Sequence, residues 1–190
     1  MMTRLFNLIA ALLLTVSFAV PTPALTNTQG RDHLTELEVE QIKDTQVLDK
    51  RIGVFVKAIE RRLRVLTGTT SDTAKQQKKD AELFGDLPRG SHGELIGDIA
   101  KILDEAITNI DDVSQRDEKN PLVPPALRLL ASEATRIVEQ LRPFRSQANS
   151  EAEVASFEAV TDSAEAILAA ANKLPPPTAK EKKKSDKSKN

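Results

Sequence analysis

The chain has 190 residues and a net charge of −1, with no cysteine, tryptophan or tyrosine and only two histidines. These counts exclude disulfides, Cys-x-x-Cys-His haem attachment and any cysteine-based active site or metal centre. Both methionines stand at the start of the chain, which excludes histidine–methionine haem ligation elsewhere. A domain of about 150 residues can still bury enough apolar surface to fold without disulfides.

The first 24 residues have the layout of a secretory signal peptide. Arg4 supplies the positive start, an apolar stretch runs from Leu5 to Phe18, and cleavage after Ala19 or after Ala24 fits the small residues that follow. The alternative is an uncleaved membrane anchor, but the apolar stretch is shorter than the ~20 residues that a spanning helix needs. We therefore expect a periplasmic or secreted protein with no transmembrane segment after signal removal.

Residues 35–174 repeat apolar side chains with the period of amphipathic helices. Four apolar stripes stand out: Leu48, Ile52, Phe55, Ile59, Leu63 and Leu66; Leu95, Ile99, Ile102, Ala106, Ile110 and Val113; Leu127, Leu130, Ala134, Ile137 and Leu141; Val154, Phe157, Val160, Ala164, Ile167 and Ala171. The pattern predicts an all-α protein, an antiparallel helical bundle of four main helices plus one or two short ones, within a domain spanning residues 25–174.

The helix boundaries carry their own signals. Three Ser/Thr-x-x-Glu capping boxes mark helix starts, namely Thr35-x-x-Glu38, Ser91-x-x-Glu94 and Ser150-x-x-Glu153. The first helix should run to about Val47, and Asp49 should cap the next. A minor helix is expected over Thr73–Phe84, Pro124-Pro125 fit a first helical turn, and Pro143 should end or kink its helix.

The helix over 95–113 has the broadest apolar side, which predicts that it is the central and most buried helix. Gly93 and Gly97 remove side chains from one face at its start. We interpret this pair as the contact point of a closely packed neighbour; a ligand-contacting loop is the alternative.

Metal-binding residues are sparse. His92, Glu94 and Asp98 can approach one another at a helix start, and they are the weak metal-site candidates. The competing interpretation is an exposed turn in which Glu94 only caps the helix. Neither histidine follows an acidic residue at the spacing of a di-iron bundle. No Walker loop, nucleophile elbow or dinucleotide fingerprint occurs, so we predict no enzyme activity and no cofactor.

Two charged stripes follow helical spacing and are candidate partner-binding faces. The basic stripe comprises Lys50, Lys57, Arg61 and Arg64, and the acidic stripe comprises Asp98, Glu105 and Asp112. Either the stripes pair with each other inside the bundle or they face a partner. Solvated faces of this kind contribute little to stability.

Residues 175–190 open with three prolines and continue with six lysines against two acids, a composition typical of a disordered segment. Its lysines, above all Lys182, Lys183 and Lys184, are candidates for binding an anionic envelope surface; a solubilising tail without a target is the alternative. The preceding domain is acidic and poor in aromatic residues, which argues against nucleic acid as the partner.

Three segments resemble a family of uncharacterised exported, all-helical bacterial proteins. They are Leu48-Asp49-Lys50-Arg51-Ile52 through Ala58-Ile59-Glu60-Arg61-Arg62-Leu63, then Ile107-x-Asn109-Ile110-Asp111-Asp112, and Ala126-Leu127-Arg128-Leu129-Leu130. The resemblance spans roughly Thr35 to Ala171. It implies an exported helical domain from a soil-type bacterium and carries over no activity and no functional residue.

The sequence thus predicts an exported, non-enzymatic helical domain that binds a protein or an anionic envelope component through charged helix faces and a basic tail. A small-ligand or metal-binding helical bundle is the alternative. The sequence leaves the oligomeric state open.

Overall fold

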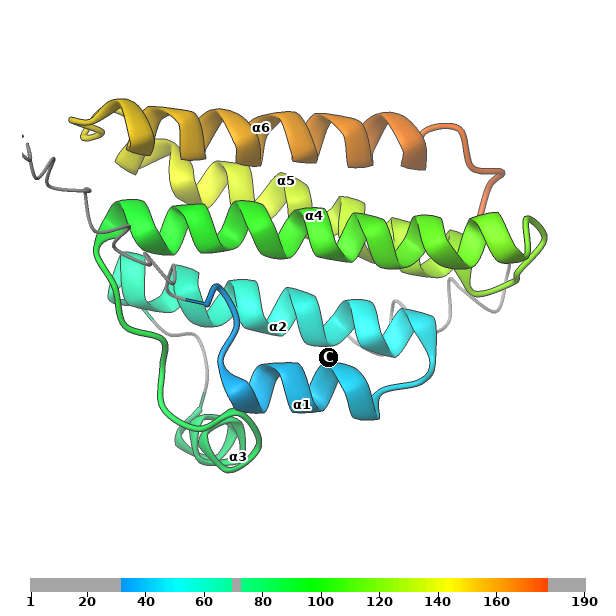
Figure 1. The fold of residues 1–190 in the computed structure, drawn as a ribbon, viewed down its shortest axis with the longest axis horizontal. Coiled ribbons are helices and arrows are strands. Elements are labelled where there is room, and N and C mark those ends of the chain that lie inside the picture. Colours follow the sequence, from blue (N-terminus) through cyan, green and yellow to red (C-terminus); the bar gives the residue numbers. More distant parts are fainter. Residues whose placement is uncertain (1–31, 70–72, 178–190) are drawn as a thin grey trace, which may run out of the picture. The chain divides into compact units, whose positions relative to one another are not determined.

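The computed structural model describes residues 32–69 and 73–177. Within these residues the chain forms six helices and no strand, as the apolar period predicts (Figure 1). The helices are α1 (Glu36–Asp44), α2 (Leu48–Thr67), α3 (Ala74–Phe84), α4 (His92–Arg116), α5 (Val123–Arg145) and α6 (Glu151–Ala171). The proposed signal peptide and the lysines of the tail lie outside the described residues.

The four long helices α2, α4, α5 and α6 make the bundle (Figure 1). Consecutive long helices run in opposite directions. α4 packs against α2 and α6, and α5 packs against the same two helices. α4 and α5 share a smaller interface, so these two consecutive helices lie on a diagonal of the bundle. Among the described residues, none of the helices combines the length and the apolarity needed to cross a bilayer.

Most of the predicted helix starts are confirmed, and two details are wrong. Thr35 and Ser91 make capping boxes, and Pro124-Pro125 lie in the first turn of α5. α2 begins after Val47, which makes no side-chain cap, so Asp49 lies in the first turn instead of capping the helix. In α6, Ser150 caps the helix as predicted. The predicted capping box is incomplete, because the Glu153 carboxylate accepts from the amide of Asn149 instead of that of Ser150.

The helix ends also differ from the prediction in places. α1 stops at Asp44 because Thr45 turns to an extended conformation and donates from its hydroxyl to Gln41 O. The predicted minor helix is α3, which ends at Gly85 with φ 68°. Pro143 lies inside the last turn of α5, which closes two residues later at Arg145.

The core is a single cluster of apolar side chains to which all four long helices contribute. α4 packs against α2, α5 and α6. The prediction that it is the most buried helix is wrong. Ten side chains of α2 are buried, against eight of α4. The reason is that α1 and α3 cover the side of α2 that faces away from the other long helices.

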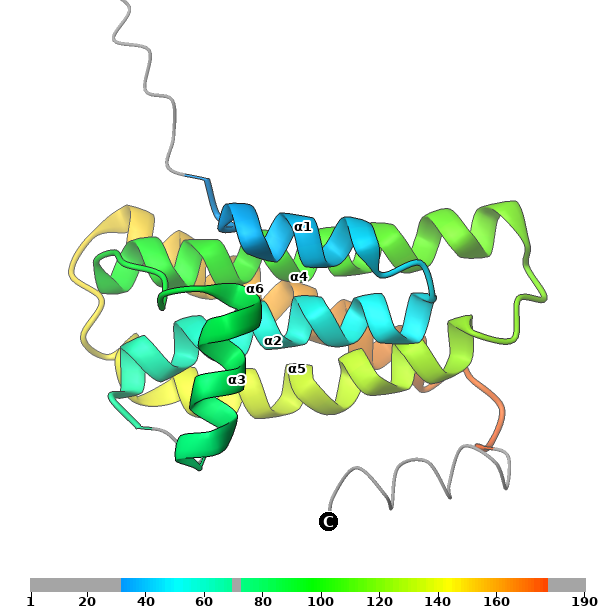
Figure 2. The ribbon, with the colours of Figure 1, turned by 90° about the horizontal axis from the view of Figure 1, so that it is seen from below.

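α1 and α3 form this second layer. α1 lies alongside α2, whereas α3 runs across the direction of the other helices (Figure 2). α1 buries only Glu38, and α3 buries only Asp80 and Phe84. The fully buried side chains of α1 and α3 are thus mostly charged, while Val39 and Ile42 of α1 add partly buried apolar contacts to the core.

The glycine pair at the start of α4 marks a close helix contact, as predicted. A Cβ atom on Gly93 would lie 2.6 Å from Glu153 Cγ, and one on Gly97 would lie 3.4 Å from Ser156 Oγ. Both neighbours belong to α6. The pair thus lets α4 and α6 approach each other closely.

Candidate functional site

Arg61 lies at the centre of a buried ionic network beneath α1 and α3. Its guanidinium is 1% exposed; Nε donates to Glu38 Oε1 at 3.1 Å and Nη1 donates to Asp80 Oδ2 at 3.4 Å. Nη2 donates to the three successive carbonyl oxygens of residues 84–86, at 3.1, 3.2 and 2.5 Å. The guanidinium also lies over the Phe84 ring, 5.5 Å from its centroid. One side chain of α2 thereby holds both α1 and the end of α3.

Arg62 is the second buried arginine of this network. Nη1 and Nη2 each donate to a carboxylate oxygen of Glu38 at 2.8 Å, a bidentate pair. Nη1 also donates to Ala58 O at 2.7 Å, and Nη2 donates to His33 O at 2.5 Å. Nε makes no hydrogen bond within the described residues and lies 3.7 Å from Asp98 Oδ2. Arg62 thus connects α1 and the segment before it to α4.

The buried charges nearly compensate one another. Two guanidiniums face the carboxylates of Glu38, Asp80 and Asp98, and the partly exposed Lys57 and Arg64 reach Asp80 at 3.0 and 3.3 Å. Buried ion pairs are weak evidence for stability, but the loss of one partner is costly because it leaves an uncompensated charge. The network therefore sets where α1 and α3 sit on α2.

The basic stripe of α2 is consequently not a free binding face. Lys50 is exposed, but Lys57 and Arg64 are partly buried against Asp80, and Arg61 is fully buried. The prediction that Arg61 meets a partner is wrong, because α1 and α3 cover it.

The acidic stripe of α4 likewise contains both buried and exposed residues. Asp98 is 4% exposed and faces Arg62, so it cannot contact a partner. Glu105 lies 2.7 Å from His33 Nε2. Asp112 remains exposed, 3.6 Å from Arg116 one turn later. The interpretation that the two stripes pair with each other is wrong for Asp98, because its ion-pair partner is Arg62, which is not a member of the basic stripe.

The three metal candidates do not converge. His92 packs edge-to-face on the Phe144 ring, with centroids 5.6 Å apart. Glu94 accepts from the Ser91 amide and hydroxyl, as a capping residue does. Asp98 turns inward to Arg62. In the described ranges no three His, Cys, Asp or Glu side chains lie close enough together to hold a metal ion. The metal-site interpretation is therefore wrong for these residues.

Sequence reasoning missed Glu38, Arg62 and Asp80 as members of this network. A signal for Arg62 was present. It lies three residues after Ile59 and four before Leu66, so it falls on the apolar stripe of its helix. A charged residue at such a position indicates a buried partner, which only the fold can identify.

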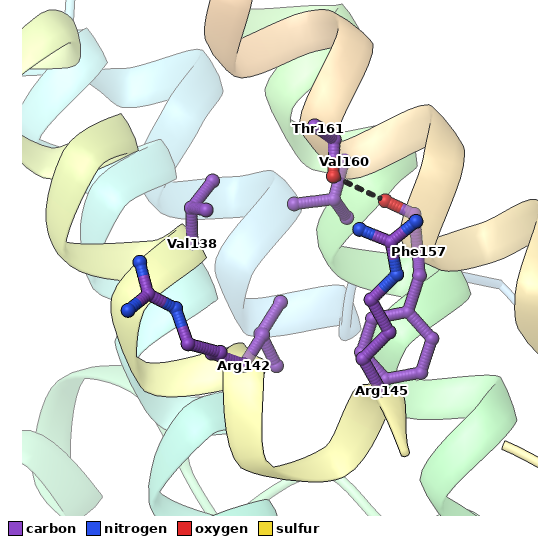
Figure 3. Close-up of a pocket in the computed structure, with 7 residues that line it drawn as sticks. Val138, Arg142, Arg145, Phe157, Val160 and Thr161 are labelled. Atoms are coloured by element: carbon purple, nitrogen blue, oxygen red, sulfur yellow. Dashed lines mark hydrogen bonds between the residues drawn. The ribbon is translucent and has the colours of Figure 1, made fainter. Parts of the chain in front are cut away.

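A half-open cavity of about 200 Å³ lies between the end of α5 and the first half of α6 (Figure 3). Its lining residues are Val138, Leu141, Arg142, Arg145, Phe157, Val160 and Thr161. Arg142 and Arg145 are exposed in the last turn of α5, and neither makes a side-chain hydrogen bond or ion pair with a described residue. Thr161 Oγ1 donates to Phe157 O at 2.9 Å. The cavity combines apolar walls with two uncompensated positive charges.

Comparison with protein-family models, with curated proteins and with solved structures finds no significant match in any of the three. The resemblance to exported helical bacterial proteins therefore stays a prediction.

Proposed function

We propose that this protein is an exported, non-enzymatic helical domain that binds an anionic component of the cell envelope through its lysine-rich tail. The observation that carries the proposal is the separation of charge along the chain. Residues 25–174 contain 20 basic and 26 acidic side chains, whereas residues 175–190 contain six lysines and two acids.

The contacts of α2 sharpen this argument. Arg61 and Arg62, two adjacent basic residues of α2, are buried and both pair with Glu38. Because both guanidiniums are buried against α1, they are not accessible to an anionic surface. The lysines near Lys183 then remain the main concentration of positive charge, and such clusters associate with anionic surfaces in a salt-dependent way.

The test is co-sedimentation of the full exported chain with vesicles of phosphatidylcholine containing phosphatidylglycerol, at low and at high salt. We expect binding at low salt that falls several-fold when Lys182, Lys183 and Lys184 are changed to Gln together, because the surface term scales with the number of clustered charges. The change of Lys75, Lys78 and Lys79 to Gln is the matched control. These lysines are exposed on α3 and carry the same total charge.

Three results would overturn the proposal: no binding of the unmodified chain at low salt to either the vesicles or a purified envelope fraction, equal binding by the tail variant, or an equal loss in the α3 control. Parallel sedimentation with a purified envelope fraction distinguishes a lipid target from a polymer target. An envelope component that binds while the vesicles do not would keep the tail as the binding element and replace the lipid.

A small-ligand binding bundle is the second candidate function. The observation that favours it is the arginine-flanked cavity between α5 and α6.

A further inference from the structure

We infer that the cavity between α5 and α6 binds a free, single-chain amphiphile whose head group is a carboxylate or a phosphate monoester. The site is distinct from the tail, and it would operate whether or not the tail binds the envelope.

The walls of the cavity suit a short apolar chain. Val138 approaches from α5, and Phe157 and Val160 approach from α6 (Figure 3). Leu141 of α5 also lines the cavity. The Thr161 hydroxyl donates its hydrogen bond to a backbone carbonyl of its own helix, so its proton needs no partner inside the cavity. With a volume of about 200 Å³, the cavity is of the order of the ~150 Å³ apolar cavity that binds a molecule of benzene.

The rim of the cavity suits an anionic head. Arg142 extends on the Val138 side of the cavity, whereas Arg145 extends along Phe157 toward α6, so the two guanidiniums lie on opposite sides of the cavity (Figure 3). A guanidinium presents donors in a planar fork that matches the oxygens of a carboxylate or a phosphate. Two such forks beside one apolar cavity form a recognition pattern for an anionic amphiphile.

The two rim arginines differ from an arginine earlier on the same helix in having no acidic partner among the described residues. Arg136, fewer than two turns earlier on the same helix, pairs with Glu60 at 2.9 Å and with Glu133 at 2.6 Å. Arg142 and Arg145 have no such carboxylate among the described residues. A bound anion would pair with these two arginines as the carboxylates of Glu60 and Glu133 pair with Arg136.

The cavity favours a free ligand over a bilayer. It is concave and is formed between two helices, and its volume accommodates one short chain rather than a surface of many lipids. The head-group chemistry is shared with membrane phospholipids, so the experiment must separate the two sources.

The first experiment is isothermal titration calorimetry of the full exported chain with octanoate and with octyl phosphate, below their micelle concentrations. We expect both to bind. Acetate and inorganic phosphate lack the chain, and 1-octanol lacks the charge, so each should bind about tenfold more weakly or not at all, a loss equal to one decade of Kd. Methyl NMR with octanoate should shift Val138 and Val160 and leave the α1–α3 layer unchanged.

The second experiment changes the rim. Arg142→Gln with Arg145→Gln should weaken octanoate binding about tenfold or more, because the charge-assisted hydrogen bonds are lost. The control is Arg116→Gln with Lys119→Gln, which removes the same charge from exposed positions at the end of α4 and in the loop before α5, and should bind like the unmodified chain. Both arginines are exposed, so the double variant should fold, which circular dichroism checks.

The inference is wrong if octanoate and octyl phosphate fail to bind at millimolar concentration, if the rim variant binds them as tightly as the control, or if the shifted methyl groups lie elsewhere. Rim-dependent binding to phosphatidylglycerol vesicles, without octanoate binding, would also overturn it and assign the two arginines to a bilayer. The triple lysine-to-glutamine variant of the tail should bind octanoate normally. Failure of the tail proposal and failure of this one are therefore distinguishable.

Discussion

Glu38 is the residue on which the α1–α2 contact depends most. Its two oxygens accept hydrogen bonds from Arg61 Nε, from both Nη atoms of Arg62 and from the Thr35 amide. The side chain is fully buried, so water cannot replace any of these bonds. A carboxylate in this position neutralises part of two adjacent guanidiniums that would otherwise repel each other inside the protein.

We expect Glu38→Gln to lower the free energy of unfolding by about 3–5 kcal/mol, since it leaves buried positive charge uncompensated. Urea unfolding followed by far-ultraviolet circular dichroism measures the loss, because the chain has no tryptophan or tyrosine to report it by fluorescence. Glu36→Gln, an exposed change two residues earlier in α1, should stay within about 0.5 kcal/mol of the unmodified chain. A loss below 1 kcal/mol for Glu38→Gln would mean that the network does not hold α1.

At the scale of elements, α1 is too short to be stable alone. It has nine residues, whereas isolated helices shorter than ~12–15 residues are marginal in water. Its capping box satisfies its first amides, and the Glu38 carboxylate anchors it on α2. α1 therefore depends on tertiary contacts with α2, namely the ion pairs of Glu38 and the partly buried side chains of Val39 and Ile42.

The two glycines of α2 should respond to alanine with opposite signs. Gly53 lies inside the helix, and a Cβ atom there meets nothing within 4 Å, so Gly53→Ala should stabilise the protein by about 0.5–1 kcal/mol. Gly68 closes the helix with φ 63°, so Gly68→Ala should destabilise it by about 1 kcal/mol. Urea unfolding of both variants provides the measurement. The same sign in both would contradict the helix geometry described for α2.

At the scale of the whole molecule, the four long helices share one apolar core and should unfold together. Ile102 is fully buried in that core. Ile102→Ala should cost about 2–5 kcal/mol through lost burial and the remaining cavity, and it should lower the unfolding midpoint of all helices at once. Leu83→Ala, at a 40% exposed position of α3, serves as the control. An Ile102→Ala transition that splits into two steps would show that the bundle is not one cooperative unit.

The sequence by itself determined the helical class and most helix starts. Capping boxes at Thr35 and Ser91, and prolines at the start of α5, act on backbone groups within one turn, so their meaning is readable without the fold. The close contact at Gly93 was also predicted, because Gly93 and Gly97 lie one helical turn apart and together clear one face of the helix. The same local rules placed the α2 cap at Asp49, where no side-chain cap forms.

Only the tertiary structure decided which charges are buried and which remain exposed. Arg62 and Glu38 are 24 residues apart, and their pairing requires α1 to fold back along α2. Asp98 looks like part of a solvated stripe until α4 brings it beside Arg62. The cavity flanked by Arg142 likewise exists only where α5 meets α6. Helical periodicity is a property of neighbouring residues, whereas ion pairing and cavities depend on distances between helices, which no local pattern specifies.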